Sequence, residues 1–457
     1  MAKPNIVFIL MDDLGWVDLG CTGSTFYETP RIDALAASGM TFGQAYASCP
    51  VCSPSRGSYL TGRYPARLGL TDWIDTTYRA HPQRATLIEA PYIHHLPRGN
   101  FTLPQALKAG GYHTWHVGKW HLGGREYYPD RVGYDVNIGG CDWGHPHQGY
   151  FAPYGIETLP DGPDGEYLTD RLTDEAIALI RGRSDDAPFF LSMCHYAVHT
   201  PIDAKPADIA RFEAKAKQLG LDKCQAIVPG EKLPTHDWNV MRRVIQSDPA
   251  YAAMIYNLDW NIGRLIDALR DVGELDNTLV IFTSDNGGLA TAEGSPTCNA
   301  PASEGKGWMY EGGTRVALLA SWPGVIAPGA CCDTPVTTTD FYPTLLDAAG
   351  LPPRPEQHLD GVSILPLLRG QTLSERPLFW HYPHYGNQGG RPGASVRLGD
   401  WKLIEFFEDG HCELYNLKTD IGEHDDLSAR EPERVAQLRA MLHAWQDDVC
   451  AVMPTRA

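Results

Sequence analysis

Polar residues stand directly after several short apolar runs of the sequence, and two such pairs could bind a metal ion. Asp12 and Asp13 follow the first run, and Asp285 and Asn286 follow a later one. Their side chains offer only oxygen ligands, which suit a hard divalent cation such as calcium or magnesium better than zinc. Either pair alone would more often be a solvated turn or a helix cap. Their shared position after strand-like runs favours a metal site.

A second group of side chains could move protons or offset negative charge. Lys119 and His121 follow one apolar run, His195 and His199 follow another, and Lys306 lies between two glycines. Positioned cations stabilise the charge that develops when an anionic ester is cleaved. A single lysine is usually a solvated surface group, and His195 could equally be a buried histidine with its hydrogen bonds satisfied. The prediction therefore depends on several segments meeting at one place.

Short buried-strand patterns alternate with helical ones, which is typical of a mostly parallel sheet covered by helices on both faces. Ligands bind at the carboxyl ends of the strands in such sheets, so four segments would deliver polar groups to one edge. Thr29 with Pro30 predicts one helix start and Asp248 with Pro249 another. The expected strands are residues 5–11, 114–118, 188–194, 279–284 and 316–322.

The sequence pattern changes after about residue 370. Short strand patterns separated by turns precede a final amphipathic helix near residues 431–447. We therefore expect a catalytic α/β domain at residues 1–370 and a smaller unit at residues 371–457, with a small antiparallel sheet and one helix. The expected strands of the smaller unit are residues 378–381, 395–398, 402–407 and 413–416.

Cys52 begins the segment Cys-Ser-Pro-Ser-Arg-Gly-Ser-Tyr-Leu-Thr-Gly-Arg, residues 52–63. A single cysteine is more often a small buried apolar residue, but this segment resembles the signature of type I sulfatases, in the alkaline phosphatase-like superfamily. Five further blocks are similar to those of the family and occur in its order. They are residues 4–15, 118–123, 199–201, 284–288 and 305–316. The resemblance implies an alkaline phosphatase-like fold and hydrolysis of sulfate esters.

The resemblance also implies a post-translational modification and a metal. A separate formylglycine-generating maturation enzyme would oxidise Cys52 to formylglycine. The metal would be calcium, with magnesium as the weaker alternative, bound by the modified residue 52 together with Asp12, Asp13, Asp285 and Asn286.

Roles in the reaction follow from the same resemblance. The hydrated aldehyde would present a hydroxyl to the metal and attack sulfur, with Asp285 helping to deprotonate it. His199, alone or with Lys306, would protonate the departing alcohol, and His121 would deprotonate the second hydroxyl to expel sulfate. The remaining catalytic assignments are Lys119, which offsets negative charge, and Arg56, which orients the hydrate.

Two ring-rich segments, residues 143–150 and 381–386, are candidates for substrate recognition. His145 and His147 lie in the first and His381 and His384 in the second. Rings with polar tips can stack on sugar faces and bond hydroxyls, although several could instead pack at a domain junction. We expect a sulfated saccharide, with 4-sulfated galactose or N-acetylgalactosamine as the specific hypothesis. The alternatives are a broad arylsulfatase, a phosphonate monoester or phosphodiester hydrolase of the same superfamily, and a non-catalytic binding protein.

Composition narrows the classes of partner. A formal net charge of −18 argues against nucleic acid, because phosphate binding needs a basic footprint. No run approaches the roughly 18 to 20 apolar residues that span a bilayer, so no membrane partner is expected. The N-terminus shows no secretory leader, and the 11 cysteines show no disulfide framework. These features predict a cytoplasmic protein, or a periplasmic or secreted one if a leader has been removed.

Overall fold

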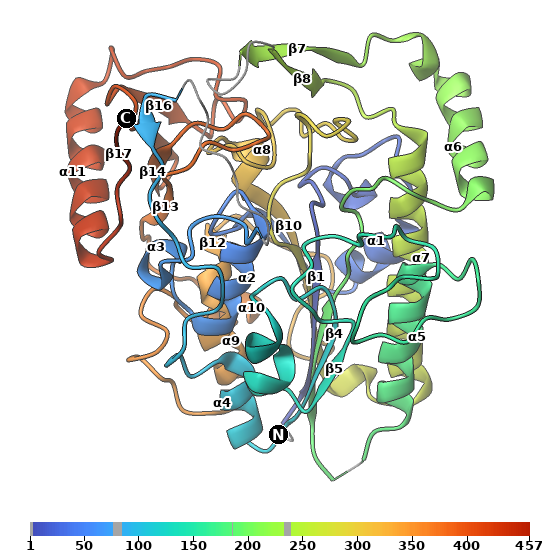
Figure 1. Cartoon of the computed structure of the whole chain (residues 1–457). Helices are drawn as coiled ribbons and strands as arrows, with labels where there is room; N and C mark the ends of the chain where they lie inside the picture. Colours follow the sequence, from blue (N-terminus) through green and yellow to red (C-terminus); the bar gives the residue numbers. More distant parts are fainter. Residues whose placement is uncertain (1–2, 76–84, 185, 233–238) are drawn as a thin grey trace.

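A nine-stranded mixed sheet forms the centre of the molecule (Figure 1). The computed structural model describes residues 3–75, 85–184, 186–232 and 239–457. The strands follow the order β11-β2-β10-β9-β1-β6-β4-β5, with β12 also paired to β2. Their bounds are β1 (Asn5–Met11), β2 (Met40–Tyr46), β4 (His113–Gly118), β5 (Val136–Ile138), β6 (Phe189–Cys194), β9 (Thr278–Ser284), β10 (Arg315–Ser321), β11 (Ala330–Cys332) and β12 (Val336–Thr337). The predicted α/β class is confirmed.

One strand of this sheet runs against the others. β10 pairs antiparallel with both β9 and β2, whereas the remaining described pairs of the sheet are parallel. Because β10 runs in the opposite direction, the residues before it lie at the same edge of the sheet as the residues that follow the other strands. The segment that precedes β10 and contains Lys306 is therefore brought to the edge where β1, β4, β6 and β9 end.

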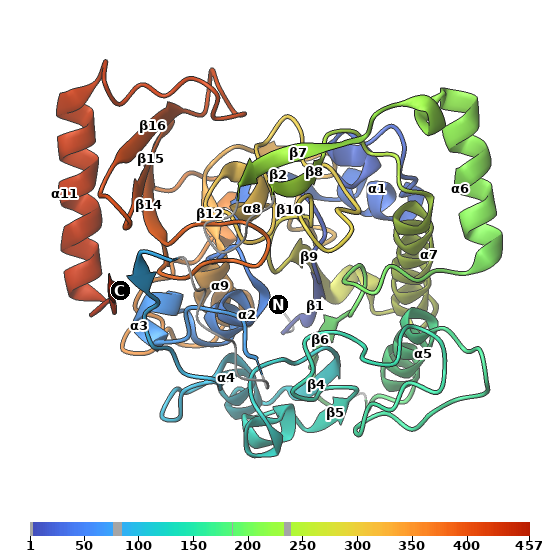
Figure 2. The ribbon, with the colours of Figure 1, turned by 45° about the horizontal axis from the view of Figure 1, so that its top comes forward.

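Helices cover both faces of the sheet (Figure 2). Phe8 of β1 stacks on Tyr59 at 4.9 Å and meets Phe341 edge-on at 5.1 Å. All seven residues of β1 are buried, as expected for a strand enclosed between two helical layers. One layer contains α1 (Pro30–Ala37), α5 (Leu168–Arg181), α6 (Pro206–Leu219) and α7 (Pro249–Asp271), and the other contains α2 (Cys52–Thr61), α4 (Leu103–Ala109), α9 (Phe341–Ala348) and α10 (Leu365–Leu368).

The two predicted helix starts are found, but only one is capped as expected. The Asp248 carboxylate accepts hydrogen bonds from the backbone amides of Ala250 and Tyr251, so it caps α7. Thr29 precedes α1, yet its hydroxyl donates to Asp33 and makes no cap bond. The first amides of α1 are instead satisfied from outside the helix by Asp259 of α7. A cap supplied by a distant residue leaves no local sequence signal.

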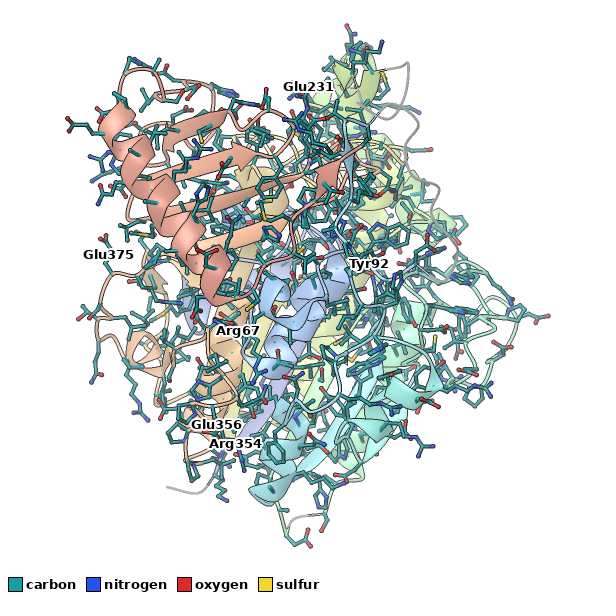
Figure 3. The ribbon with its side chains drawn as sticks, turned by 60° about the vertical axis from the view of Figure 1, so that its left-hand side comes forward. Arg67, Tyr92, Glu231, Arg354, Glu356 and Glu375 are labelled. Carbon is teal, nitrogen blue, oxygen red and sulfur yellow. The ribbon has the colours of Figure 1, made fainter. Side chains whose placement is uncertain are left out.

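The C-terminal part of the chain forms the predicted antiparallel sheet and helix. The strands β13 (Leu378–Tyr382), β14 (Gly393–Leu398), β15 (Trp401–Phe406) and β16 (Cys412–Asn416) pair in sequence order, and α11 (Pro432–Asp448) covers one face (Figure 3). Arg67 of α3 (Pro65–Leu68) bonds Asp448 at the end of α11 and Asp360. The boundary at residue 370 stays a prediction.

One short helix and two small ribbons also belong to the described structure. The helix α8 (Glu311–Thr314) precedes β10. The two-stranded ribbons are β3 (Leu87–Ile88) with β17 (Thr455–Arg456), and β7 (Ile227–Lys232) with β8 (Asn239–Arg243). The β7–β8 ribbon lies at the end of the molecule opposite the N-terminus (Figure 1).

A buried charge cluster joins the two sheets. The ammonium group of Lys402 in β15 bonds Glu311 at 3.0 Å and Glu423 at 2.8 Å, and all three side chains are fully buried. Glu311 also accepts from Arg315 at 2.7 Å and from Tyr46 at 2.7 Å. Buried carboxylates need such partners, because an unpaired charge is costly inside a protein.

Replacing Lys402 with methionine should therefore destabilise the protein. Glu423 would lose its cation, whereas Glu311 would keep Arg315, so we expect the free energy of unfolding to fall by about 3 to 5 kcal/mol. Chemical unfolding monitored by circular dichroism would measure it. Lys418→Met is the matched control, because Lys418 is exposed and its nearest carboxylate oxygen, on Asp400, is 4.0 Å away. Equal unfolding midpoints for the two variants would contradict the role given to the cluster.

Candidate active site

Cys52 lies at the first position of α2, at the carboxyl edge of the main sheet. The strand β2 precedes it and ends at this edge, because β2 is parallel to β9. The side chain is buried, with 3% of its surface exposed, and it lines a cavity of about 260 Å³. Burial raises the pKa of its thiol, although Lys119 and Lys306 oppose the rise. An unmodified Cys52 would therefore remain a protonated thiol near neutral pH, and a thiol is a poor nucleophile.

His121 faces Cys52 with a defined ring nitrogen. Its Nε2 lies 2.8 Å from the carbonyl oxygen of Ile74, and its Nδ1 lies 3.3 Å from the Cys52 sulfur. A carbonyl oxygen only accepts, so Nε2 carries the proton of the neutral ring. Burial, helped by Lys119, holds the pKa of His121 well below its usual value. The lone pair of Nδ1 therefore points at position 52, where it can accept a proton.

Three carboxylates and three cations are paired one to one beneath Cys52. Arg56 bonds Asp285 at 2.8 Å and the carbonyl oxygen of Lys119 at 3.0 Å. The ammonium group of Lys119 bonds Asp12 at 2.6 Å, and that of Lys306 bonds Asp13 at 2.8 Å. All six side chains are buried. With every group ionised, the three negative and three positive charges balance, so the group holds no surplus positive charge for an anionic substrate.

The oxygen-rich part of this group fits a metal ion. Ligand atoms of Asp12, Asp13 and His199 lie within 4.8 Å of one another and are buried. One carboxylate oxygen of Asp12 and the amide oxygen of Asn286 have no hydrogen-bond partner among the described residues. Burial raises the pKa of Asp12 despite Lys119, and the nearby carboxylate of Asp285 adds to the rise. A bound cation would satisfy both oxygens and relieve this crowding of negative charge.

His199 and Lys306 form a hydrogen-bonded pair at the cavity floor. The ring Nδ1 of His199 lies 3.0 Å from the carbonyl oxygen of Thr200, so Nδ1 carries the proton of the neutral ring. Its Nε2 then accepts from the Lys306 ammonium at 2.9 Å. Burial alone would lower the pKa of Lys306, but Asp13 and other acids, Glu293 among them, hold it above its ordinary value. The pair therefore presents a proton to the cavity.

A stack of rings forms one wall of the cavity. Trp143 stacks on His147 at 4.1 Å, His147 lies 4.6 Å from His145, and His145 stacks on His199 at 5.8 Å. All four line the cavity. Two of the histidines predicted to bind substrate thus lie beside the floor residues. Gly144, between them, packs against His121 so closely that an added Cβ would lie 2.6 Å from its ring.

The structure does not bring the other three predicted histidines to the cavity. His195 is buried, with its pKa lowered to about 3 by desolvation, and neither ring nitrogen has a hydrogen-bond partner among the described residues. His381 bonds the carbonyl oxygen of Val452 at 3.0 Å, and its strand places it beneath the final helix. His384 is buried against the Thr71 hydroxyl at 2.8 Å. These substrate-binding predictions are corrected: the three side chains pack inside the protein.

Sequence reasoning missed several cavity residues that belong to loops. Glu293, Asn387 and Gln388 line it together with Asp75 and Asp142. Asn387 and Gln388 are the first two residues beyond the ring-rich segment 381–386, so that signal lies directly beside them in the sequence. Nothing in the sequence around Glu293 distinguishes it from a surface acid.

Comparisons with known proteins agree with this geometry. A family model described as "Sulfatase" matches residues 4–351, which is more than half of the chain. The chain belongs to the sulfatase family. A second model, for the C-terminal region of N-sulphoglucosamine sulphohydrolase, matches residues 304–448 of this sulfatase. The protein is therefore a sulfuric ester hydrolase with the alkaline phosphatase-like fold that the sequence indicated.

Individual relatives extend the match over nearly the whole of this sulfatase. A "Sulfatase" of Formosa agariphila is 32% identical, over 97% of this chain and 88% of its own length. The N-acetylgalactosamine-6-sulfatase of Mus musculus is also 32% identical, over 97% and 80%. A crystal structure of Ps i-CgsB in complex with k-i-k-neocarrahexaose is similar with a TM-score of 0.77 and 29% identity, over 97% of this chain and 92% of that one.

No helix in the described ranges of the sulfatase combines the length and apolar character needed to cross a bilayer.

Proposed function

We propose that this sulfatase removes sulfate from a carbohydrate and that formylglycine at position 52 is its nucleophile. The observation that carries the proposal is the Nδ1 lone pair of His121, which lies 3.3 Å from the Cys52 sulfur above three buried ion pairs. A hydrated aldehyde at this position has two hydroxyls, and a base facing it is needed to remove a proton from one of them.

The side chains take part in three proton transfers. One hydroxyl of the hydrate passes its proton to Asp285, attacks sulfur and becomes sulfated, while the Lys306–His199 pair delivers a proton to the departing sugar oxygen. His121 then takes the proton of the remaining hydroxyl through Nδ1. The carbon–oxygen double bond re-forms, sulfate leaves and the aldehyde is restored. Arg56 and Lys119 hold Asp285 and Asp12 in place and offset negative charge throughout.

We further propose that the bound metal is calcium. Asp12, Asp13, Asp285 and Asn286 would hold it through oxygen atoms, a set that suits a hard cation. His199 is left out because Lys306 already occupies its Nε2. The cation would supply the positive charge that the balanced ion pairs lack and would polarise the sulfate group.

Calcium should therefore stabilise the folded protein. A ligand that binds only the native state adds about 2.7 kcal/mol when its free concentration is one hundred times its Kd, and the melting temperature should rise with calcium concentration. Asn286→Ala is the informative variant, because it removes a neutral oxygen ligand and leaves the ion pairs intact. Differential scanning calorimetry would measure both proteins. An equal rise in the variant, or none in the unaltered protein, would count against the site.

The proposal of a carbohydrate rests on the cavity wall, where the stack of Trp143 and histidines offers faces and polar tips to a sugar ring. The mouse relative is named for N-acetylgalactosamine 6-sulfate, so position 6 is a candidate beside the 4-sulfated sugars that the sequence suggested. Sulfate release from a panel of galactose and N-acetylgalactosamine 4- and 6-sulfates, with nitrophenyl sulfate for comparison, tests this. Cleavage of nitrophenyl sulfate without cleavage of any sugar sulfate would favour a broad arylsulfatase.

Maturation needs its own check, because protein from a host without the maturation enzyme would be inactive. Conversion of Cys52 to the aldehyde lowers the mass of the chain by about 18 Da. Intact-mass spectrometry of each preparation, followed by peptide mapping of residues 52–63, would show the converted fraction.

A further inference from the structure

We propose that Glu293 determines which sugars the cavity accepts: its carboxylate receives hydroxyls beside the scissile sulfate and rejects a second anionic group there. The inference rests on the proposed carbohydrate sulfatase function and deepens it. It predicts that the preferred substrate carries one sulfate on the sugar in the cavity.

Glu293 is held rigidly with one oxygen left over. The side-chain amides of Asn387 and Gln388 donate to the same carboxylate oxygen, Oε1, at 2.6 and 2.8 Å. Within the described ranges, no donor bonds the other oxygen, Oε2. Because the Glu293 side chain lines the cavity and remains exposed, Oε2 is available to accept a hydrogen bond from a substrate hydroxyl.

The backbone around Glu293 is fixed from two sides. Arg243 and Met241 of β8 bond Ala290 and Ala292 at 2.9 and 3.1 Å, so the ribbon clamps the start of the loop. The carbonyl oxygen of Gln388 accepts from Thr291 at 2.8 Å and from Trp308 at 3.0 Å. A carboxylate held this way loses little conformational freedom when it binds a ligand, which favours selective recognition.

The charges around the cavity determine that a second anionic group on the sugar is disfavoured. Among the described residues that line the cavity, Lys306 is the permanent cation, and Asp13 already neutralises it. Asp142 and Glu293 are acids on the walls. The sulfate to be cleaved meets the metal and the floor cations, but a second sulfate or a carboxylate on the same ring would meet these acids. Two like charges about 5 Å apart in a partly solvated site repel enough to change binding roughly tenfold.

The size of the cavity agrees with a single sugar ring. Sites for drug-sized ligands run from about 300 Å³ upward, and this cavity holds about 260 Å³. The ring stack and Glu293 come from the loops after β5 and β9, which lie on opposite sides of β1 in the sheet. A sugar placed between them would have its face on the rings and its hydroxyls toward Glu293.

The test compares Glu293→Gln with the unaltered protein, both with Cys52 converted. The substrates are the N-acetylgalactosamine monosulfate that the protein cleaves and the 4,6-disulfate, with kcat/KM normalised to nitrophenyl sulfate for the same variant. We expect the unaltered protein to prefer the monosulfate at least tenfold at low salt, and the variant to reduce that preference about fivefold. The matched control is Glu126→Gln, an exposed acid paired with Arg98, which should keep the preference.

The outcomes separate the two proposals. If the converted protein cleaves sugar sulfates but Glu293→Gln leaves the preference unchanged, the role of Glu293 is wrong and the carbohydrate sulfatase function stands. A preference for the disulfate in the unaltered protein would also overturn the inference. If converted protein cleaves no sugar sulfate at all, the proposed function fails and the inference fails with it.

Discussion

Replacing Cys52 with alanine is expected to lower kcat for sulfate release by at least about 10⁴-fold, because alanine cannot be oxidised to the aldehyde that carries the attacking oxygen. Among the described residues that line the cavity, none is placed to supply the attacking oxygen in place of residue 52. The hydroxyl in that lining belongs to Thr200, and its oxygen lies 3.2 Å from Nδ1 of His199. Rates of sulfate release at saturating substrate, measured by ion chromatography, would give the size of the loss.

Cys49→Ala is the matched control for this experiment. Cys49 is also buried and lies three residues away, but its thiol donates to the carbonyl oxygen of Thr71, at 3.9 Å. This variant should retain most of the activity and should still lose about 18 Da on maturation. A Cys52→Ala protein with near-normal kcat would refute the nucleophile, whatever the fate of the substrate assignment.

The strands that precede the proposed metal ligands could be predicted because they are buried on both faces. The predicted runs at residues 5–11 and 279–284 match β1 and β9 to within one residue. Continuous apolar sequence is the expected signal of such strands, and a polar pair directly after each one then falls at the same edge. Asp13 and Asp285 lie close together for this reason: the Asp13 amide donates to the Asp285 carboxylate at 3.4 Å.

The strand that positions Cys52 gave no such signal. β2 has the sequence Met-Thr-Phe-Gly-Gln-Ala-Tyr, with partly exposed residues at Thr41, Gly43 and Gln44. Its pattern is neither a continuous apolar run nor a strict alternation, because it packs between the antiparallel β10 and the short strands β11 and β12. From sequence, Cys52 could be placed in the site only through its resemblance to a family signature.

Ring-rich segments proved to be an ambiguous signal for substrate recognition. Residues 143–150 and 381–386 look alike in composition, yet only the first places its histidines in the cavity. The second begins in β13, and side chains on both faces of this strand are hydrogen-bonded to neighbouring segments. Trp380 donates to the carbonyl oxygen of Ala47, and His381 bonds that of Val452. Which ring faces solvent depends on long-range packing between the small sheet and α11, and local sequence does not encode it.

Gly144→Ala is expected to lower kcat for sugar sulfates by at least about 10²-fold. An ideal Cβ at this position would lie 2.6 Å from Cε1 and 2.8 Å from Nε2 of His121, far inside contact distance. His121 cannot yield without losing the bond from Nε2 to Ile74 that fixes its tautomer. A displacement of about 1 Å in a proton-transferring group costs on the order of 10²-fold in rate. Steady-state kinetics with circular dichroism as a folding check would measure the effect.

Gly124→Ala is the control for this second prediction, because Gly124 lies three residues after His121 in the loop that follows β4 and has open space around its Cβ position. It should keep near-normal kcat. If the loop of residues 143–147 moves in place of His121, Gly144→Ala should instead raise KM for sugar sulfates and spare nitrophenyl sulfate, which does not need the ring stack. A loss of kcat on both substrates would indicate that the His121 side chain has been displaced. Unchanged kinetics on both would mean that His121 does not hold the position from which we derive its role as a base.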